Sequence, residues 1–114
     1  MSKSSRRAAA RLLKSAALFA ALGDGTRLEI VSKLADGSQQ SITQLAADAT
    51  VTRQAITKHL RVLESAGIVH SAKSGRETLF ALQPRSLEEA QRALAAVSEQ
   101  WDAALARLKT FVES

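Results

Sequence analysis

The stretch Thr50-Val-Thr-Arg-Gln-Ala-Ile-Thr-Lys-His-Leu-Arg-Val-Leu-Glu-Ser-Ala66 decides the fold, because helical spacing divides it into two unlike faces. One face is polar and consists of Arg53, Gln54, Thr57, Lys58 and Arg61. The rest of the circumference is filled by Ala55, Ile56, His59, Leu60, Val62 and Leu63. The only acid, Glu64, lies near the C-terminal end. Cations without interspersed carboxylates suit a phosphate-lined groove. An isolated helix of this kind also fits an ordinary solvated face, so its context has to decide.

The composition predicts one mainly helical domain without thiol chemistry. A chain of 114 residues is long enough for one domain, and with only three Phe, one Trp and no Tyr its core has to consist of Leu, Ile, Val and Ala. The absence of Cys excludes disulfides, thiolate metal sites and cysteine nucleophiles. His59 and His70 are too isolated to make a zinc site, and neither a Ser/His/acid set nor a Gly-rich phosphate loop is present. We therefore expect neither an enzyme nor a bound cofactor or metal.

The net charge of +5 is concentrated in two segments. Residues 1–14 carry +5 and residues 49–83 carry +3, whereas residues 15–48 and 84–114 carry −2 and −1. Positive charge in a terminal segment and around the polar helix points to a polyanionic partner.

Residues 1–10 are basic and free of acids, and we expect them to form a flexible arm ahead of a folded domain at residues 11–114. Secretory and transit peptides share this composition and are an alternative. Against them, the apolar run at 16–22 is short, Lys14 abuts it, and no stretch is long enough to span a membrane. We therefore expect a cytoplasmic protein without a membrane partner.

Turn and capping residues divide the first half of the domain into short helices. A helix over about residues 11–22 ends at Gly23, and Asp24 can cap a second helix that stops at residues 36–37. Ser41-Ile-Thr-Gln44 has the form of a capping box and opens a short third helix.

Thr52 is placed to cap the cationic helix, which ends at Gly67. Two helices separated by a short turn, of which the second carries a polar cationic face, have the layout of a helix-turn-helix.

Two β-prone runs follow, at residues 68–72 and 77–82, joined by Lys73-Ser-Gly-Arg76. This pattern predicts a hairpin with Gly in the turn. A tip that carries Lys73 and Arg76 is a wing able to reach an adjacent minor groove or its phosphates. A charged turn that only keeps the protein soluble is the alternative.

The segment from about Leu87 to Val112 is predicted to form one long helix with a narrow apolar stripe. The stripe contains no charged residue and consists of Leu87, Ala90, Leu94, Val97, Trp101, Leu105, Leu108 and Val112. A small core could not cover so long a seam, whereas a second copy or the first helix could. We predict a homodimer through the first and last helices, anchored by Trp101. The expected interface residues are Leu12, Ala16, Phe19, Leu94, Val97, Trp101, Leu105 and Leu108. The alternative is that the stripe packs wholly inside its own domain.

Four segments together resemble the ArsR/SmtB-type winged helix-turn-helix transcriptional regulators. They are Leu22-Gly-Asp-Gly-Thr-Arg-Leu-Glu-Ile-Val31, Ile42-Thr-Gln-Leu-Ala46, Thr52-Arg-Gln-Ala-Ile-Thr-Lys-His-Leu-Arg-Val-Leu-Glu-Ser-Ala-Gly-Ile-Val69 and Gly75-Arg-Glu77. The resemblance covers about residues 12–112, and the third segment is its most specific part. It implies a mainly helical homodimer with a β-hairpin wing, and a repressor that binds a pseudo-palindromic operator.

The resemblance also places Thr52, Gln54, Thr57 and His59 on positions that the family uses in its recognition helix. His59 turns toward the protein on the helical wheel, so we expect it to make a structural hydrogen bond. The predicted DNA-binding residues are Thr52, Arg53, Gln54, Thr57, Lys58, Arg61, Lys73 and Arg76.

The chain departs from the metal-sensing branch of this family. That branch needs cysteines in the helix at residues 42–47, or Asp and His ligands along the last helix. The helix at residues 42–47 has no Cys, and the last helix has no His and offers in its C-terminal half only the carboxylates Glu99, Asp102 and Glu113. We expect a member without metal-sensing ligands whose signal, if it has one, is an unidentified small-molecule effector. An all-carboxylate cation site at the dimer interface is the alternative.

The sequence therefore predicts a sequence-specific DNA-binding regulator, with two alternatives. A winged helix can serve as a protein-interaction module whose basic face binds an acidic partner. The basic N-terminus is also compatible with non-specific architectural DNA binding.

Overall fold

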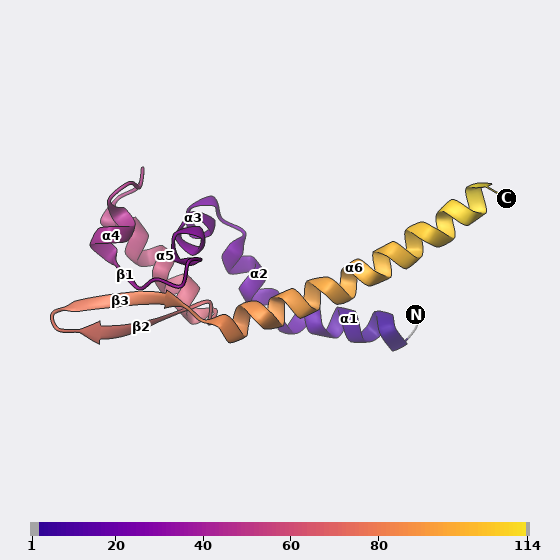
Figure 1. The fold of residues 1–114 in the computed structure, drawn as a ribbon, viewed down its shortest axis with the longest axis horizontal. Coiled ribbons are helices and arrows are strands. Elements are labelled where there is room, and N and C mark those ends of the chain that lie inside the picture. The colour runs from indigo at the N-terminus through magenta and orange to yellow at the C-terminus, as the bar shows by residue number, and fades with distance from the viewer. Residues whose placement is uncertain (1–2, 114) are drawn as a thin grey trace.

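A computed structural model of the chain describes residues 3–113. Its elements are α1 (Lys3–Lys14), α2 (Ala16–Leu22), α3 (Gly25–Leu34), β1 (Gln40–Ser41), α4 (Ile42–Ala46), α5 (Arg53–Ser65), β2 (Val69–Ser74), β3 (Glu77–Leu82) and α6 (Pro84–Glu113) (Figure 1). The molecule is elongated, measuring 66 × 26 × 21 Å, because α6 extends far beyond the body and the hairpin projects in the opposite direction. This mainly helical architecture with a small sheet confirms the predicted winged helix-turn-helix fold.

The core lies where helices α2 to α5 meet the root of the hairpin. Its largest fully buried side chains are all aliphatic, as the shortage of aromatic residues predicts: Ile30, Leu34, Leu45, Ile56, Leu60, Leu63 and Ile68. Phe80 of β3 is the one aromatic side chain that is buried among the described residues. Burial of this aliphatic cluster holds α5 against the body.

The predicted helix starts are confirmed by their hydrogen bonds. The carboxylate of Asp24 accepts the backbone N–H of Arg27 at 3.1 Å. Ser41 and Gln44 form the expected reciprocal capping box, with distances of 3.2 and 2.8 Å. These caps satisfy backbone donors that the first turn of each helix leaves unpaired, so they define where α3 and α4 begin.

The sheet is antiparallel, with strand order β1-β3-β2. Ser74 pairs with Glu77 across a two-residue turn, where Gly75 has a φ of 65°. A left-handed residue at the first central position fits a type II′ hairpin turn, which needs Gly there. Strand β1, which the sequence pattern does not reveal, adds only two residues to the edge of β3.

The N-terminus differs from expectation. Residues 3–14 form helix α1, whereas their composition predicts an arm ahead of a helix that begins near Arg11. Helix α1 packs along α6, and Ala8 is only 3% exposed. Ser15 interrupts the expected single helix, so that α1 follows α6 while α2 stays on the core.

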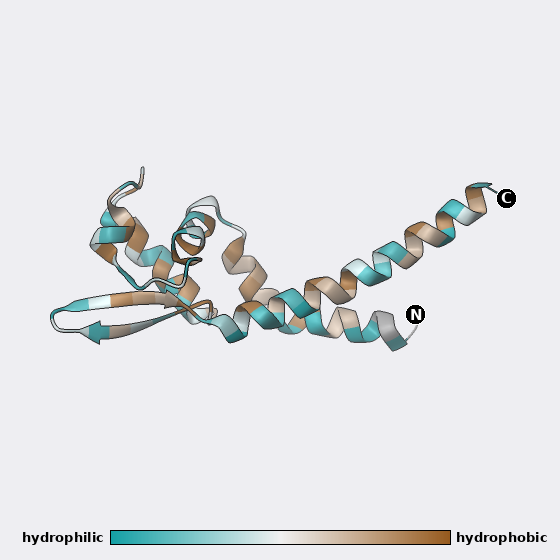
Figure 2. Cartoon of the chain, in the orientation of Figure 1, coloured by the Kyte–Doolittle hydropathy of each residue, from teal (hydrophilic) through white to brown (hydrophobic). Residues whose placement is uncertain are grey.

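Helix α6 begins at Pro84, whose fixed φ suits the first helical position, rather than near Leu87. Ala90 and Ala93 are buried, but apolar side chains continue to the far end of the helix, beyond the reach of α1 (Figures 1 and 2). Their exposed fractions include 69% for Trp101 and 60% for Leu105. The start of the stripe is therefore covered by the core, whereas most of its length from Leu94 onward is not covered within its own chain. No helix within residues 3–113 is long and apolar enough to cross a membrane.

Candidate nucleic-acid interface

The start of α5 is defined by Thr52. Its hydroxyl oxygen accepts the backbone N–H of Ala55 at 3.1 Å, which is the predicted N-cap. Thr52 remains exposed, at the end of the helix where backbone N–H groups point outward. A helix N-terminus of this kind favours an approaching phosphate.

Helix α5 separates its two faces as its periodicity predicts. Ile56, Leu60 and Leu63 are at most 1% exposed and join the core. The side chains on the opposite side are exposed, and they are Arg53, Gln54, Lys58 and Arg61. This face offers three cations and one amide to the outside.

Thr57 departs from the expected pattern in part. It is half-buried, and its hydroxyl donates to the carbonyl of Arg53 at 2.9 Å. Its hydroxyl proton is therefore used within the helix, while the oxygen keeps acceptor capacity.

The single acid of α5 serves the wing. Glu64 accepts a hydrogen bond of 2.7 Å from the hydroxyl of Ser71 on β2. This bond links the last turns of α5 to the hairpin. The sequence shows Glu64 as an isolated acid, but only the fold reveals its partner.

The hairpin carries the two remaining predicted cations at its tip. Lys73 and Arg76 are both exposed, and the hairpin extends away from the body beside α5 (Figure 1). The structure thus brings α5 and the hairpin to the same end of the molecule, opposite the free end of α6 (Figure 1).

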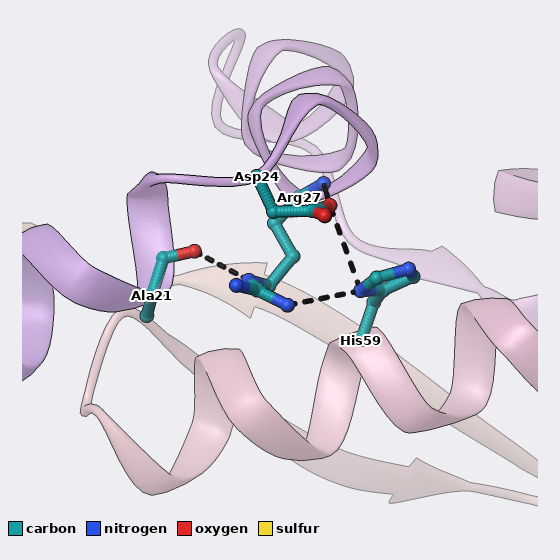
Figure 3. Close-up of polar contacts among 4 residues, drawn as sticks. All are labelled: Ala21, Asp24, Arg27 and His59. Carbon is teal, nitrogen blue, oxygen red and sulfur yellow. Dashed lines mark hydrogen bonds and ion pairs between the residues drawn. The ribbon is translucent and has the colours of Figure 1, made fainter.

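A polar bridge fixes α5 to α2 and to the start of α3 (Figure 3). The guanidinium of Arg27 donates from Nη1 to His59 Nδ1 at 3.2 Å, and from Nε to the carbonyl of Ala21. The Asp24 carboxylate lies 3.7 Å from the same His59 nitrogen. His59 therefore makes the structural contact that the helical wheel predicts. The participation of Asp24 and Arg27 is not predictable from the sequence, because no local pattern relates Arg27 to a residue 32 positions away.

The same bridge affects the Asp24 carboxyl group. The backbone N–H of Arg27, followed by the charges of Arg27 and His59, lowers the pKa of Asp24 below its ordinary value. Asp24 is therefore ionised at neutral pH, where it both caps α3 and faces His59.

The predicted interface residues fall into two groups. Leu12, Val97 and Phe19 are half-buried, and Phe19 packs on the core. The others are exposed, and they are Ala16, Leu94, Trp101, Leu105 and Leu108. Within the described residues, no group of three or more His, Cys, Asp or Glu side chains is arranged to hold a metal ion.

Comparison with known proteins identifies the architecture. Residues 24–71 match the model of the family described as bacterial regulatory protein, arsR family. An ArsR-like transcriptional regulator from Rhodococcus sp. RHA1 has a similar structure, with a TM-score of 0.73 and 39% identity over 87% of this chain and 92% of that chain.

Two curated relatives carry related names. The HTH-type transcriptional regulator YuzN of Bacillus subtilis is 42% identical over 53% of this chain and 72% of its own length. The HTH-type transcriptional repressor SmtB of Mycobacterium tuberculosis is 34% identical over 61% of this chain, which spans only 51% of that relative. These relatives are regulators rather than enzymes. From the family match together with the Rhodococcus structure, the chain belongs to the arsR family of bacterial transcriptional regulators.

Proposed function

We propose that this regulator is a homodimeric repressor that binds an inverted-repeat operator through α5 and the wing. The observation that carries the proposal is the exposed face of α5, on which three cations accompany a hydrogen-bonding amide. Such a protein acts on chromosomal DNA, and we place it in the cytoplasm.

The residues of this surface divide into two roles. Lys58, Arg61, Lys73 and Arg76 are suited to neutralise phosphates and release counterions, which supplies affinity without sequence preference. Gln54 and Arg53, in the first turn of α5, are suited to read adenine and guanine edges bidentately. Thr52 and Thr57 border this pair, and their oxygens are available as acceptors.

Binding to an inverted repeat requires two copies of the chain, one for each half-site. The exposed stripe of α6 offers a surface that a second copy would cover, and a two-fold axis there would present two α5 helices to DNA. Successive major grooves on one side of the duplex lie roughly 34 Å apart. The SmtB relative is named a repressor, which supports assigning repression rather than activation to this chain.

Selection from random double-stranded DNA tests the proposal directly. The purified protein is expected to enrich an inverted repeat, and the enriched duplex should resist competition by excess random DNA near physiological salt. Placing that repeat over a promoter should lower transcription in a purified system when the protein is added.

Each alternative predicts a different result. Non-specific architectural binding would give retention without enrichment and equal competition by random DNA. A protein-interaction module would retain no DNA at that salt concentration. Either result would overturn the proposal.

A further inference from the structure

A second basic feature lies away from α5, in a groove between α1 and the middle of α6. The groove has a volume of about 650 Å³, and its cations are Arg7, Arg11 and Arg107. Glu99 is the one acid in its lining. Within residues 3–113, none of these three guanidinium groups lies within 4.0 Å of a carboxylate oxygen. The groove therefore keeps an excess of positive charge, because one carboxylate faces three guanidinium groups and forms no ion pair with any of them.

Gln100 adds an unused donor to this groove. Its side-chain Nε2 is buried and has no hydrogen-bond partner. A buried amide donor without an acceptor destabilises a fold, so an acceptor supplied by a ligand would be stabilising. Guanidinium groups likewise match a carboxylate, which they can bind through two parallel N–H bonds.

The remaining lining is apolar. It consists of the indole of Trp101 and the alanines Ala8, Ala96, Ala103 and Ala104. Small-molecule sites have this volume and this combination of apolar walls with a few polar groups. A lone inorganic anion would satisfy the arginines but leave these walls uncovered.

We propose that the groove binds a small organic carboxylate with an aromatic body, and that this ligand weakens operator binding through Trp101. The carboxylate meets Arg11, Arg107 and the free donor of Gln100, while the ring lies against Trp101. The second half of the proposal rests on the dimeric DNA-binding function proposed above.

Trp101 connects the groove to the proposed dimer seam. At 100° per residue, Leu94, Leu105 and Leu108 lie within about 40° of Trp101 around α6, whereas Ala96 and Arg107 lie roughly 120–140° away. A second copy on the stripe therefore approaches α6 from a side other than that of Ala96 and Arg107, and it shares Trp101 with the groove. A ligand that displaces the Trp101 ring changes a side chain of the seam, and with it the relative placement of the two α5 helices.

Phenylbutyrate is the probe for the site, with the neutral phenylbutyramide as its control. Trp101 is the only Trp and the chain has no Tyr, so intrinsic fluorescence reports on this groove. Titration of the DNA-free protein is expected to show saturable binding of phenylbutyrate by calorimetry, accompanied by a change in Trp101 fluorescence. Phenylbutyramide should bind at least roughly tenfold more weakly because it lacks the charge. Absence of phenylbutyrate binding at millimolar concentrations, or equal binding of the amide, overturns the proposal.

Substitutions in the groove test whether phenylbutyrate binds there. Arg11→Gln and Arg107→Gln should each weaken phenylbutyrate binding by roughly tenfold. Arg92→Gln removes the same charge from an exposed α6 position outside the groove and should leave binding unchanged. Gln100→Leu should raise the melting temperature, because it removes the unpaired donor, and should also weaken binding. A more stable Gln100→Leu variant with unchanged binding would contradict the assigned role of Gln100.

The claim that the ligand weakens operator binding is tested by a separate measurement of operator affinity. Saturating phenylbutyrate should lower the affinity of the wild type for the selected operator by about fivefold or more, and should have no effect on Arg107→Gln at the same concentration. Unchanged operator affinity in a protein shown to bind the probe overturns the coupling. Failure of the ligand-free wild type to bind any DNA instead contradicts the proposed function, and the DNA-free titration still decides whether the groove is a site.

Discussion

At the scale of single residues, the polar bridge around His59 shows how this protein positions its DNA-facing helix. The apolar side of α5 fixes its depth in the core, but apolar contacts alone allow a helix to slide or rotate slightly. The directed bonds from Arg27 to His59 and to the Ala21 carbonyl join three helices at one point. The bridge therefore restricts the orientation from which Arg53 and Gln54 project.

Asp24 gives this bridge a pH dependence. The pKa of Asp24 is lowered in the folded protein, so its ionised form stabilises the fold above the ordinary carboxyl pKa, and that stability is lost as the pH falls through the folded-state value. The Asp24→Asn variant should be less stable than the wild type at neutral pH. The difference should begin to shrink below roughly pH 4 and should vanish only below the lowered pKa of the folded protein.

Urea unfolding measured at stepwise lower pH checks this expectation. Asp102→Asn makes the same chemical change on the exposed surface of α6 and serves as the control. If Asp24→Asn and the wild type lose stability in parallel as acid is added, the lowered pKa does not contribute to folding.

At the scale of elements, α5 and the wing divide the proposed DNA contact into reading and anchoring. Helix α5 is short, with 13 residues, and its first turn carries the side chains suited to base edges. The hairpin is held at its root by the bond between Ser71 and Glu64, so its charged tip keeps a defined relation to the end of α5. The two elements therefore make separate contributions that mutations can distinguish.

Gln54→Ala is expected to relax base preference. Loss of the bidentate amide should cost about 1–3 kcal/mol on the selected operator, with discrimination lost at one position in each half-site. Binding isotherms on a panel of single-base operator variants measure this. A uniform loss over the whole panel would contradict a reading role for Gln54.

Arg76→Ala is expected to weaken all sequences alike. A wing cation at a phosphate contributes to counterion release, so its loss should lower the slope of log affinity against log salt by about one for each contact. Isotherms at several salt concentrations measure the slope. Lys109→Ala, at the far end of α6, is the matched control and should not change it. Indistinguishable salt slopes for Arg76→Ala and this control would exclude a phosphate contact.

At the scale of the whole molecule, the most prominent feature is the long free end of α6, which leaves apolar side chains uncovered. A chain of this size cannot surround a 30-residue helix with its own core, and α1 covers only one of its sides. Exposing so many apolar side chains along one stripe to water is unfavourable unless another surface covers them. The geometry favours a second copy, because the stripe is straight, continuous and free of charge.

Leu105→Asp should abolish the dimer. A charge in the middle of the stripe would be buried without a partner in the pair but solvated in a single chain. Sedimentation at micromolar concentrations is expected to show a monomer with unchanged helical content, and operator binding should be lost. Ala106→Asp places the same charge on the neighbouring position, which turns away from the stripe, and should remain dimeric. A wild type that sediments as a monomer at these concentrations would contradict the proposed assembly.

Local sequence signals determined much of this fold. The caps at Asp24, Ser41 and Thr52 depend on neighbours within three residues, so the chain order alone predicts them. The two faces of α5 and the Gly-containing turn of the hairpin are equally local, because periodicity and a single left-handed residue define them. For the same reason the sequence predicts the exposed side chains of α5, apart from Thr57, which is half-buried.

Only the tertiary structure decided the features that depend on distant neighbours. Residues 3–14 read as an arm because their composition is that of a solvated segment, yet they form a helix when α6 provides a surface for Ala8. The joining of Asp24 and Arg27 to His59, the bond from Ser71 to Glu64 and the groove around Gln100 each bring together residues from separate elements. Backbone propensity and spacing act over a few residues, whereas these contacts exist only after helices have packed.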